Sequence, residues 1–381
     1  MKRKNIGNEF QGLYQLLTDK NKEFILWGAA NIGKEIYKEY SEKINIVKIV
    51  DKNPIKCDKN IGNCIVESST NIKINKNNII IITTSSYEEV SKELNTKGYR
   101  RNIDYIDYFL FVKVYELYKN DFLISGRLDI SITEKCTLKC EKCNMFMPYF
   151  KQPKDYSIDY IKRDLDSYFN VVDYVRDLNL LGGEPFLYPE FTQVLEYISE
   201  KYIDKIKRIE IFTNGTLIPS EKLLELIKKC NVVVQISDYT NRIDYSKRLQ
   251  DVIQLFDKYS IKYYILKSEI WGDFGYPENP NTLEGENELI SFFDKCKAPF
   301  RGLYNNKVYF CHLETSAIRA GLFEDEKNDY FDLKKSSSNI KKLFMEFDEG
   351  YSDKGYITFC KKCRGCGCVN NMTVKSALQM K

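Results

Sequence analysis

The chain has 381 residues, enough for about two or three domains of roughly 150 residues each. Lys and Arg number 58 against 54 Asp and Glu, and the basic residues are scattered. This balance argues neither for nor against nucleic acid, and we expect no nucleic-acid partner. No stretch approaches the roughly 20 apolar residues that cross a bilayer, and no apolar signal region follows the first residues, so we expect a cytoplasmic protein without a membrane partner.

Cysteine usage is the informative part of the composition. Of the 12 cysteines, Cys57, Cys64 and Cys230 are isolated, whereas the others fall in or near tight groups. Because the cytosol keeps thiols reduced, grouped cysteines there indicate metal or redox chemistry rather than disulfides. The single histidine, His312, argues against catalytic triads and histidine-rich zinc sites.

Residues 1–120 are predicted to form a Rossmann-like, doubly wound α/β domain. Apolar runs and helical patterns alternate in this part, and Ser86 to Glu89 has the pattern of a capping box. The expected elements are helices at 9–20, 34–40, 86–97 and 108–119, and strands at 24–27, 44–50 and 79–84.

A glycine-containing turn follows the first of these strands. Gly28, Ala30 and Gly33 stand where a dinucleotide fingerprint has three glycines, and Asp51 follows about 20 residues later, where such folds place a ribose-binding acid. Alanine in the middle position would crowd a pyrophosphate. Two interpretations therefore stand: a nucleotide or nucleotide-sugar site, or a degenerate module used for packing or partner binding, in which Asp51 is a turn residue.

Residues 121–270 are predicted to form a partial (β/α)6 TIM-like barrel, because strand-like and helical segments alternate. Ligand sites in such folds lie at the carboxyl ends of the strands, where polar residues do occur here. The expected strands are 128–133, 177–181, 206–213, 232–237 and 261–266, and the expected helices are 158–170, 189–202, 220–229 and 246–259. The segment 271–285 is either a plain connector or a flap over the site.

The most informative motif is CxxxCxxC, formed by Cys136, Cys140 and Cys143 directly after the first barrel strand. Thiolates are the usual ligands of iron-sulfur clusters, and three of them leave one iron of a cluster open. A zinc loop is the alternative, but zinc would require a fourth Cys or His, and the loop has none.

In combination, these motifs resemble the radical S-adenosylmethionine (SAM) enzymes. CxxxCxxC after a first strand, Gly-Gly-Glu-Pro at 182–185 and Thr-Asn-Gly at 213–215 occur in that family in this order. The resemblance implies that the three cysteines hold a 4Fe-4S cluster whose fourth iron is chelated by SAM. Reductive cleavage would then give a 5′-deoxyadenosyl radical that abstracts a substrate hydrogen, and an electron donor such as flavodoxin or ferredoxin would be a partner.

The resemblance also implies cofactor contacts. Gly182 and Gly183 would let the backbone approach SAM, and Glu184 or a neighbouring carbonyl would accept from its ammonium group. Thr213, Asn214 and Ser237 would contact its ribose or carboxylate. Lys142 departs from the aromatic residue frequent before the third cysteine, and Phe146 is the candidate replacement.

Six further cysteines follow in 271–381, which we expect to form a third domain. This part resembles the twitch or SPASM extensions that hold auxiliary 4Fe-4S clusters, and a single cluster fits better than two. The expected ligands are Cys296, Cys311, Cys360 and Cys363, with Cys366 or Cys368 as substitutes; a structural zinc ribbon is the alternative. A hairpin turning at Asn305 and Asn306 would bring Cys296 and Cys311 together, and His312 is expected to be a hairpin residue.

Three functions follow from these features. The first is a radical SAM enzyme that oxidises or otherwise modifies a small sugar-like or nucleotide-linked molecule, with the auxiliary cluster binding the substrate or accepting an electron. The second is a SPASM-type maturase of a ribosomal peptide, which the α/β amino-terminal region disfavours. The third is a non-catalytic redox or iron sensor.

Overall fold

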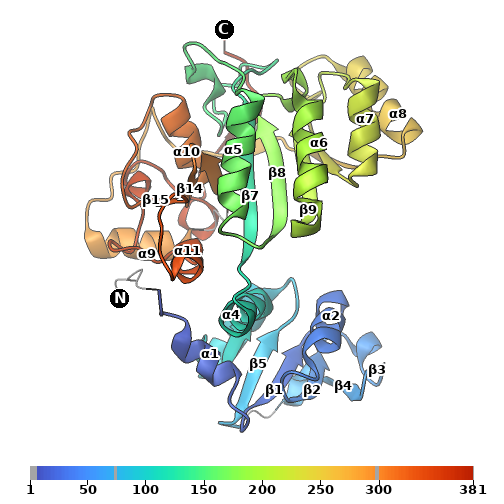
Figure 1. Ribbon diagram of the computed structural model, residues 1–381, viewed down its shortest axis with the longest axis vertical. Coiled ribbons are helices and arrows are strands. Elements are labelled where there is room, and N and C mark those ends of the chain that lie inside the picture. Colours follow the sequence, from blue (N-terminus) through green and yellow to red (C-terminus); the bar gives the residue numbers. More distant parts are fainter. Residues whose placement is uncertain (1–6, 73–74, 297–299, 381) are drawn as a thin grey trace. The chain divides into compact units, whose positions relative to one another are not determined.

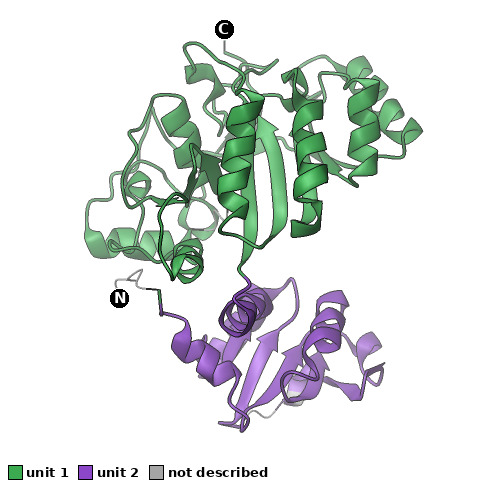
Figure 2. Cartoon of the chain, viewed as in Figure 1, with its two compact units in different colours: residues 1–7, 123–381 green, residues 8–122 purple. Residues whose placement is uncertain are grey.

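The computed structural model describes residues 7–72, 75–296 and 300–380. The chain divides into two compact units, residues 8–122 and residues 1–7 with 123–381 (Figure 2). The first boundary lies close to the expected one at 120. Residues 271–381 do not separate from 123–270, because a strand of the carboxyl-terminal part pairs with the first strand of the expected barrel.

Unit 8–122 is an α/β structure around a six-stranded sheet with the order β3-β4-β2-β1-β5-β6. All neighbours pair in parallel except β3 and β4. Its strands are β1 (Glu23–Trp27), β2 (Ile46–Asp51), β3 (Asn60–Ile61), β4 (Cys64–Ser68), β5 (Asn78–Ile82) and β6 (Tyr105–Asp107). Its helices are α1 (Gln11–Leu17), α2 (Asn31–Tyr40), α3 (Tyr87–Thr96) and α4 (Tyr108–Asn120), with 3-10 turns at Pro54–Lys56 and Ser69–Asn71.

The central strands of this sheet are continuous apolar runs, as expected for parallel strands covered on both faces. Every residue of β5 is buried, and so are Phe24 to Trp27 of β1. The close packing of β1 against α2 depends on a glycine, since a Cβ atom at Gly33 would lie 1.9 Å from the carbonyl oxygen of Gly28. The second glycine of the turn therefore serves the packing of the helix on the sheet.

The second unit contains an eight-stranded sheet with the order β11-β10-β9-β8-β7-β13-β14-β15, and a two-stranded sheet of β12 and β16 (Figure 1). Strands β7 to β11 and β13 run parallel, and β14 and β15 continue antiparallel. The strands are β7 (Ile124–Thr133), β8 (Tyr174–Gly182), β9 (Ile206–Thr213), β10 (Val233–Asp238), β11 (Lys262–Lys267), β12 (Ile270–Gly272), β13 (Arg301–Tyr304), β14 (Lys307–Tyr309), β15 (Tyr330–Asp332) and β16 (Thr373–Lys375).

Helices connect the parallel strands and cover the apolar face of the sheet (Figure 1). Leu128, Ile130 and Ile132 of β7 are fully or almost fully buried, and they alternate with residues that point to the opposite face. The helices are α5 (Ile158–Phe169), α6 (Phe191–Lys201), α7 (Glu221–Lys229), α8 (Ser246–Lys258), α9 (Glu286–Lys295), α10 (His312–Arg319) and α11 (Ile340–Asp348). Short 3-10 turns lie at Met147–Tyr149, Pro185–Leu187, Ile203–Lys205, Thr358–Lys361 and Gly367–Val369.

Three details differ from the sequence predictions. Ser86 precedes α3, but its side chain makes no capping hydrogen bond, so the capping box is absent. Strands β3, β4 and β6 were not predicted, because they are short and all three carry polar residues. The hairpin of β13 and β14 does turn at Asn305 and Asn306, both with positive φ, but His312 lies beyond it as the first residue of α10.

Within the described residues, no helix combines the length and the apolar composition that crossing a membrane requires.

Replacing Gly33 by Ala should destabilise unit 8–122 by about 1–3 kcal/mol, because the added methyl group would overlap the Gly28 carbonyl. The matched control is Gly12→Ala in α1, where a Cβ atom meets no other atom within 4 Å and helix propensity favours alanine. The free energy of unfolding of both variants is measured by urea unfolding, followed by Trp27 fluorescence in a Trp271→Phe background. Equal stability of the two variants would contradict the proposed role of Gly33.

Candidate metal centre

The turn after β8 is interlocked with the start of the cysteine loop after β7. The Gly183 N–H donates to the Thr133 carbonyl at 3.1 Å, and the Glu184 N–H donates to the Lys135 carbonyl at 2.8 Å. A Cβ atom at Gly183 would lie 2.1 Å from the Lys135 oxygen. Glycine at 183 therefore lets the backbone pass directly beside the segment that leads into Cys136.

Glu184 joins this turn to the one after β9. Its side chain is fully buried and accepts hydrogen bonds from the Thr213 hydroxyl at 2.7 Å, the Asn214 N–H at 2.8 Å and the Phe186 N–H at 3.1 Å. Burial raises the pKa of this carboxyl group to about 7, against the opposing effect of these donors. Through these hydrogen bonds Glu184 links the turns that follow β8 and β9.

The three thiols of the loop after β7 lie close together. Each of Cys136, Cys140 and Cys143 interacts electrostatically with the other two, and burial raises the pKa of Cys136 to about 12 and that of Cys140 to about 11. Hydrogen-bond donors surround the sulfurs: the Leu138 N–H lies 3.5 Å from Cys136 Sγ, and the Gln379 amide nitrogen lies 3.2 Å from Cys140 Sγ.

This donor set suits a cluster of iron and sulfide. N–H groups directed at the sulfurs favour the thiolate form and are a standard means of tuning such clusters. Within residues 7–72, 75–296 and 300–380, no group of three or more Cys, His, Asp or Glu side chains is placed to hold a single metal ion.

The remaining predicted contact residues lie at the same end of the sheet. Asn214 is buried, and its amide nitrogen lies 3.0 Å from the Thr137 hydroxyl and 3.8 Å from Cys136 Sγ. Ser237 lies on β10 and is partly exposed, with its hydroxyl 3.5 Å from the Gln235 amide nitrogen. The structure thus brings Asn214 to the thiols directly, whereas Ser237 interacts with Tyr239, which in turn lies beside Cys140 and Cys143.

Lys142 and Phe146 both contact the segment 273–281. Lys142 forms an ion pair with Glu278 at 2.9 Å, and the ring of Phe146 packs edge-on against Tyr276 at 6.0 Å. Phe146 has positive φ and is buried in the same apolar cluster as Cys311. It therefore packs toward the carboxyl-terminal cysteines.

The four expected carboxyl-terminal ligands also come together. Each of Cys296, Cys311, Cys360 and Cys363 interacts electrostatically with the other three, and burial raises the pKa values of Cys311, Cys360 and Cys363, the last to about 12. The two candidate substitutes are more peripheral. Cys366 interacts with Cys363, and the exposed Cys368 places its sulfur 3.5 Å from the Lys295 carbonyl.

The segment 273–281 lies between the two cysteine groups and contacts both. Besides the contacts of Glu278 and Tyr276 with the first group, Asp273 pairs with Arg364 at 2.8 Å, and Asn281 donates from its amide to the Cys360 carbonyl at 3.1 Å. Tyr276 also packs against Phe359 at 5.4 Å. The segment is therefore a packed bridge in this structure.

The face of the sheet opposite the connecting helices is polar. In register across β7, β8 and β9, Arg127 lies beside Asp177 and Asp177 beside Arg208, while the next row contains Asp129, Asn179 and Glu210. The residues of the second row are almost completely buried, with exposures of 3%, 0% and 3%.

Two features of this polar face bear on ligand binding. His312 of α10 approaches Asp129, with Nδ1 3.4 Å from the carboxylate, and burial lowers the pKa of the imidazole. The Asn179 amide nitrogen donates to Asp129 at 2.6 Å, but within the described part of the chain its buried Oδ1 has no hydrogen-bond partner. An unsatisfied buried acceptor of this kind calls for a donor from elsewhere.

In unit 8–122, the candidate nucleotide-binding residue Asp51 is hydrogen-bonded to the backbone. Asp51 accepts from the N–H groups of Ala29 and Asn53, both at 2.8 Å, and pairs with Lys56 at 3.2 Å. Burial acts to raise the pKa of Asp51, but these donors outweigh it and hold the pKa below its usual value. Ala30 is exposed at the start of α2.

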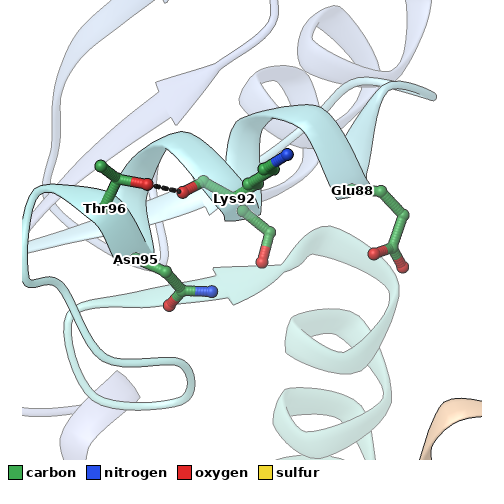
Figure 3. Close-up of a pocket in the computed structure, with 5 residues that line it drawn as sticks. Glu88, Lys92, Asn95 and Thr96 are labelled. Atoms are coloured by element: carbon green, nitrogen blue, oxygen red, sulfur yellow. Dashed lines mark hydrogen bonds between the residues drawn. The ribbon is translucent and has the colours of Figure 1, made fainter.

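A separate depression lies on the surface of α3 (Figure 3). All of its lining residues come from this one helix, and none is a predicted site residue. Thr96 donates from its hydroxyl to the Lys92 carbonyl within it at 2.9 Å. The lining residues are Glu88, Ser91, Lys92, Asn95 and Thr96.

Two residues near the first thiol group were missed by the sequence analysis. Tyr239 packs with the three cysteines and with Trp271, at 5.6 Å between ring centroids. Its position directly after β10 is a signal that could have identified it, because ligand sites lie at strand ends. Gln379 is 239 residues from Cys140, and no local pattern marks it.

Comparison with known sequences agrees with this geometry. The sequence model of the Radical SAM superfamily matches residues 130–278. The antilisterial bacteriocin subtilosin biosynthesis protein AlbA of Bacillus subtilis is 31% identical over 124 residues, which are 31% of this chain and 25% of that protein. A probable GTP 3′,8-cyclase of Methanococcus maripaludis is 33% identical over 99 residues, 26% of this chain and 31% of that protein.

The chain spans about a quarter to a third of the length of these relatives. Among solved structures, BtrN in complex with AdoMet and 2-DOIA aligns with a TM-score of 0.42 and 17% identity, over 64% of this chain and 94% of that one. Native anSMEcpe with bound AdoMet aligns with a TM-score of 0.31 and 22% identity, over 37% and 43%.

The protein thus carries a radical SAM domain, the class whose cofactors are a 4Fe-4S cluster and S-adenosylmethionine. Its cysteine-rich carboxyl-terminal part fits the twitch or SPASM type of extension.

Replacing Asp51 by Asn should destabilise unit 8–122 by about 2 kcal/mol at pH 7, because charge-assisted hydrogen bonds to two N–H groups and Lys56 are weakened. The folded state holds the pKa of Asp51 below its unfolded value of about 4, so this contribution is complete above pH 4 and lost as the pH falls below it. The measurement is urea unfolding of both proteins across this range. A stability difference that does not depend on pH would contradict the assignment.

Gly183→Ala should prevent the loop after β7 from reaching its position, since the new methyl group would overlap the Lys135 carbonyl. We expect the reconstituted variant to retain less than half of the wild-type iron at this loop. Iron analysis after anaerobic reconstitution measures the loss, with Gly12→Ala as the control. Wild-type iron content in Gly183→Ala would show that the close approach is dispensable.

Proposed function

We propose that the chain is a radical SAM enzyme whose open-site cluster is held by Cys136, Cys140 and Cys143. Their mutual proximity, their burial and the N–H donors at their sulfurs support this assignment. When bound, the cluster and SAM together supply a 5′-deoxyadenosyl radical that removes a hydrogen atom from the substrate. Gly182, Gly183, Asn214 and the neighbouring backbone carbonyls would line the cofactor, and Glu184 would hold their turns in place.

We further propose one auxiliary 4Fe-4S cluster on Cys296, Cys311, Cys360 and Cys363. The support is that each of these thiols interacts with the other three, whereas Cys366 is partly exposed and Cys368 is exposed. A cluster there would accept the electron left on the substrate after hydrogen removal, and the net reaction would be an oxidation.

We infer the substrate class from the polar face of the sheet. Charged and amide side chains fill two rows across β7, β8 and β9, and the Asn179 Oδ1 has no hydrogen-bond partner among the described residues. Burying such groups is costly unless they are hydrogen-bonded. A small molecule rich in hydroxyl groups, such as a sugar or a nucleotide-linked sugar, would satisfy them.

In this proposal the chain's own residues orient the substrate and move a proton. Asn179 would accept from a substrate hydroxyl, and Asp129 would fix both Asn179 and His312 through the contacts at 2.6 and 3.4 Å. Arg127 stacks on Phe300 at 4.0 Å and pairs with Asp129, which holds the row in place. An oxidation releases one proton, and a carboxylate of the polar face would accept it.

A peptide substrate is the second candidate. It is favoured by the similarity to AlbA, a bacteriocin biosynthesis protein, and by the exposed edge strand β11. Tyr264, Ile265 and Leu266 of that strand are 43% to 50% exposed. An extended peptide could add to this edge, which is a common mode of peptide recognition.

The class of reaction is tested by incubating anaerobically reconstituted, reduced protein with SAM. We expect release of 5′-deoxyadenosine by the wild-type protein and none by Cys140→Ala. Iron analysis of the same preparations should give about eight irons per chain in the wild type and about four in Cys140→Ala and in Cys363→Ala. A cluster-loaded wild-type protein that never releases 5′-deoxyadenosine would support the sensor interpretation.

The substrate class is tested by ligand screening. Nucleotide sugars and free sugars are compared with a set of ribosomal precursor peptides for acceleration of SAM cleavage. We expect the sugars to accelerate SAM cleavage in the wild type and not in Asn179→Leu. The control is Gln193→Leu, at an exposed position of α6, which should behave as the wild type does. Acceleration by peptides alone would favour the maturase.

A further inference from the structure

The segment 376–380 runs along the loop of the first cysteine group, and Figure 1 shows the carboxyl-terminal end of the chain beside this loop. The Glu141 N–H donates to the Leu378 carbonyl, and the Met380 N–H donates to the Lys139 carbonyl, both at 2.8 Å. Cys140 and Gln379 thus pair as residues in an antiparallel β-bridge. The loop gains backbone partners on both sides of its central cysteine.

The Gln379 side chain adds two specific contacts to this bridge. Its Oε1 accepts from the Lys139 N–H at 2.8 Å, and its Nε2 lies 3.2 Å from Cys140 Sγ. Nε2 also donates to the Ala377 carbonyl at 2.9 Å, which fixes the orientation of the amide group. Because Oε1 faces an N–H donor and Nε2 faces two acceptors, these hydrogen bonds distinguish the oxygen from the nitrogen of the amide group.

Neighbouring residues anchor the segment so that Gln379 is held in place. Strand β16 pairs antiparallel with β12, and the fully buried Ser376 donates from its N–H to the Glu269 carbonyl and from its hydroxyl to the Ser268 carbonyl. Ala377 is 1% exposed and packs in the same apolar cluster as Leu138 and Cys140. The amide therefore reaches the sulfur from a fixed backbone.

We propose that Gln379 is a positioning residue that shapes the loop of the open-site cluster and raises the reduction potential of that cluster through its hydrogen bond to Cys140. This inference rests on the proposed function, since it takes Cys140 as a cluster ligand. The three members of the CxxxCxxC loop are not equivalent in this respect: the amide from the distant segment serves Cys140, whereas a local backbone N–H serves Cys136.

The direction of the effect follows from electrostatics. Reduction adds negative charge to the cluster and its thiolates, and an N–H dipole directed at a ligand sulfur stabilises that charge. Removing the donor makes reduction harder and lowers the potential. Replacing the amide by a carboxylate removes the donor and adds a negative charge near the sulfur, which lowers the potential further.

The test compares Gln379→Leu and Gln379→Glu with the wild type and with Gln193→Leu. Each full-length protein is reconstituted, and its midpoint potential is measured by titration of the electron paramagnetic resonance signal that SAM alters. We expect the potential to fall in the order wild type, Gln379→Leu, Gln379→Glu, and Gln193→Leu to match the wild type. A SAM-sensitive signal with the same midpoint in all four proteins would overturn the proposal.

Hydrogen exchange of the cluster-free proteins provides a second readout. The Lys139 amide should exchange about tenfold faster in Gln379→Leu, which lacks its acceptor, and remain protected in Gln379→Glu, which retains one. Equal protection in all proteins would refute the shaping role. If the wild type takes up no SAM-sensitive cluster, the proposed function fails, and the exchange measurement alone decides whether Gln379 shapes the loop.

Discussion

The buried carboxylate of Glu184 is the contact on which the candidate site depends. It accepts from Thr213, Asn214 and Phe186, while its own N–H group is bonded to Lys135. One residue thereby links the segments that follow β7, β8 and β9. Because parallel strands end at the same edge of the sheet, this link converts three separate turns into one surface around the thiols.

The sequence predicted the parts of this arrangement that are local or periodic. Between residues 123 and 267, the alternation of apolar and helical segments predicted the strands and helices to within a few residues, and the motifs were correctly expected at strand ends, because both signals repeat over several residues. After residue 267, only the hairpin of β13 and β14 was predicted. The linking contacts of Glu184 were not predicted. A carboxylate beside a glycine pair suggests ligand binding, and the hydrogen bonds that join it to the turn after β9 have no local signal in the sequence.

The sequence could not predict contacts between distant segments. Whether 271–285 is a connector or a flap depends on Glu278, Tyr276 and Asn281 meeting partners far away in the chain. The same holds for Asp51, whose position matched a nucleotide-binding acid but whose carboxylate is bonded to the backbone of the turn. The joining of 271–381 to the preceding sheet, through the pairing of β13 with β7, likewise has no local signal.

The bridge between Cys140 and Gln379 has a consequence for maturation of the protein. The two residues are 239 positions apart, so during synthesis the ribosome completes the cysteine loop long before its partner exists. Contacts of such high sequence separation form late in folding, because the loop-closure entropy must be overcome first. The cysteine loop is therefore synthesised well before the segment 376–380, and its position alongside that segment becomes fixed only when the carboxyl-terminal part of the chain folds.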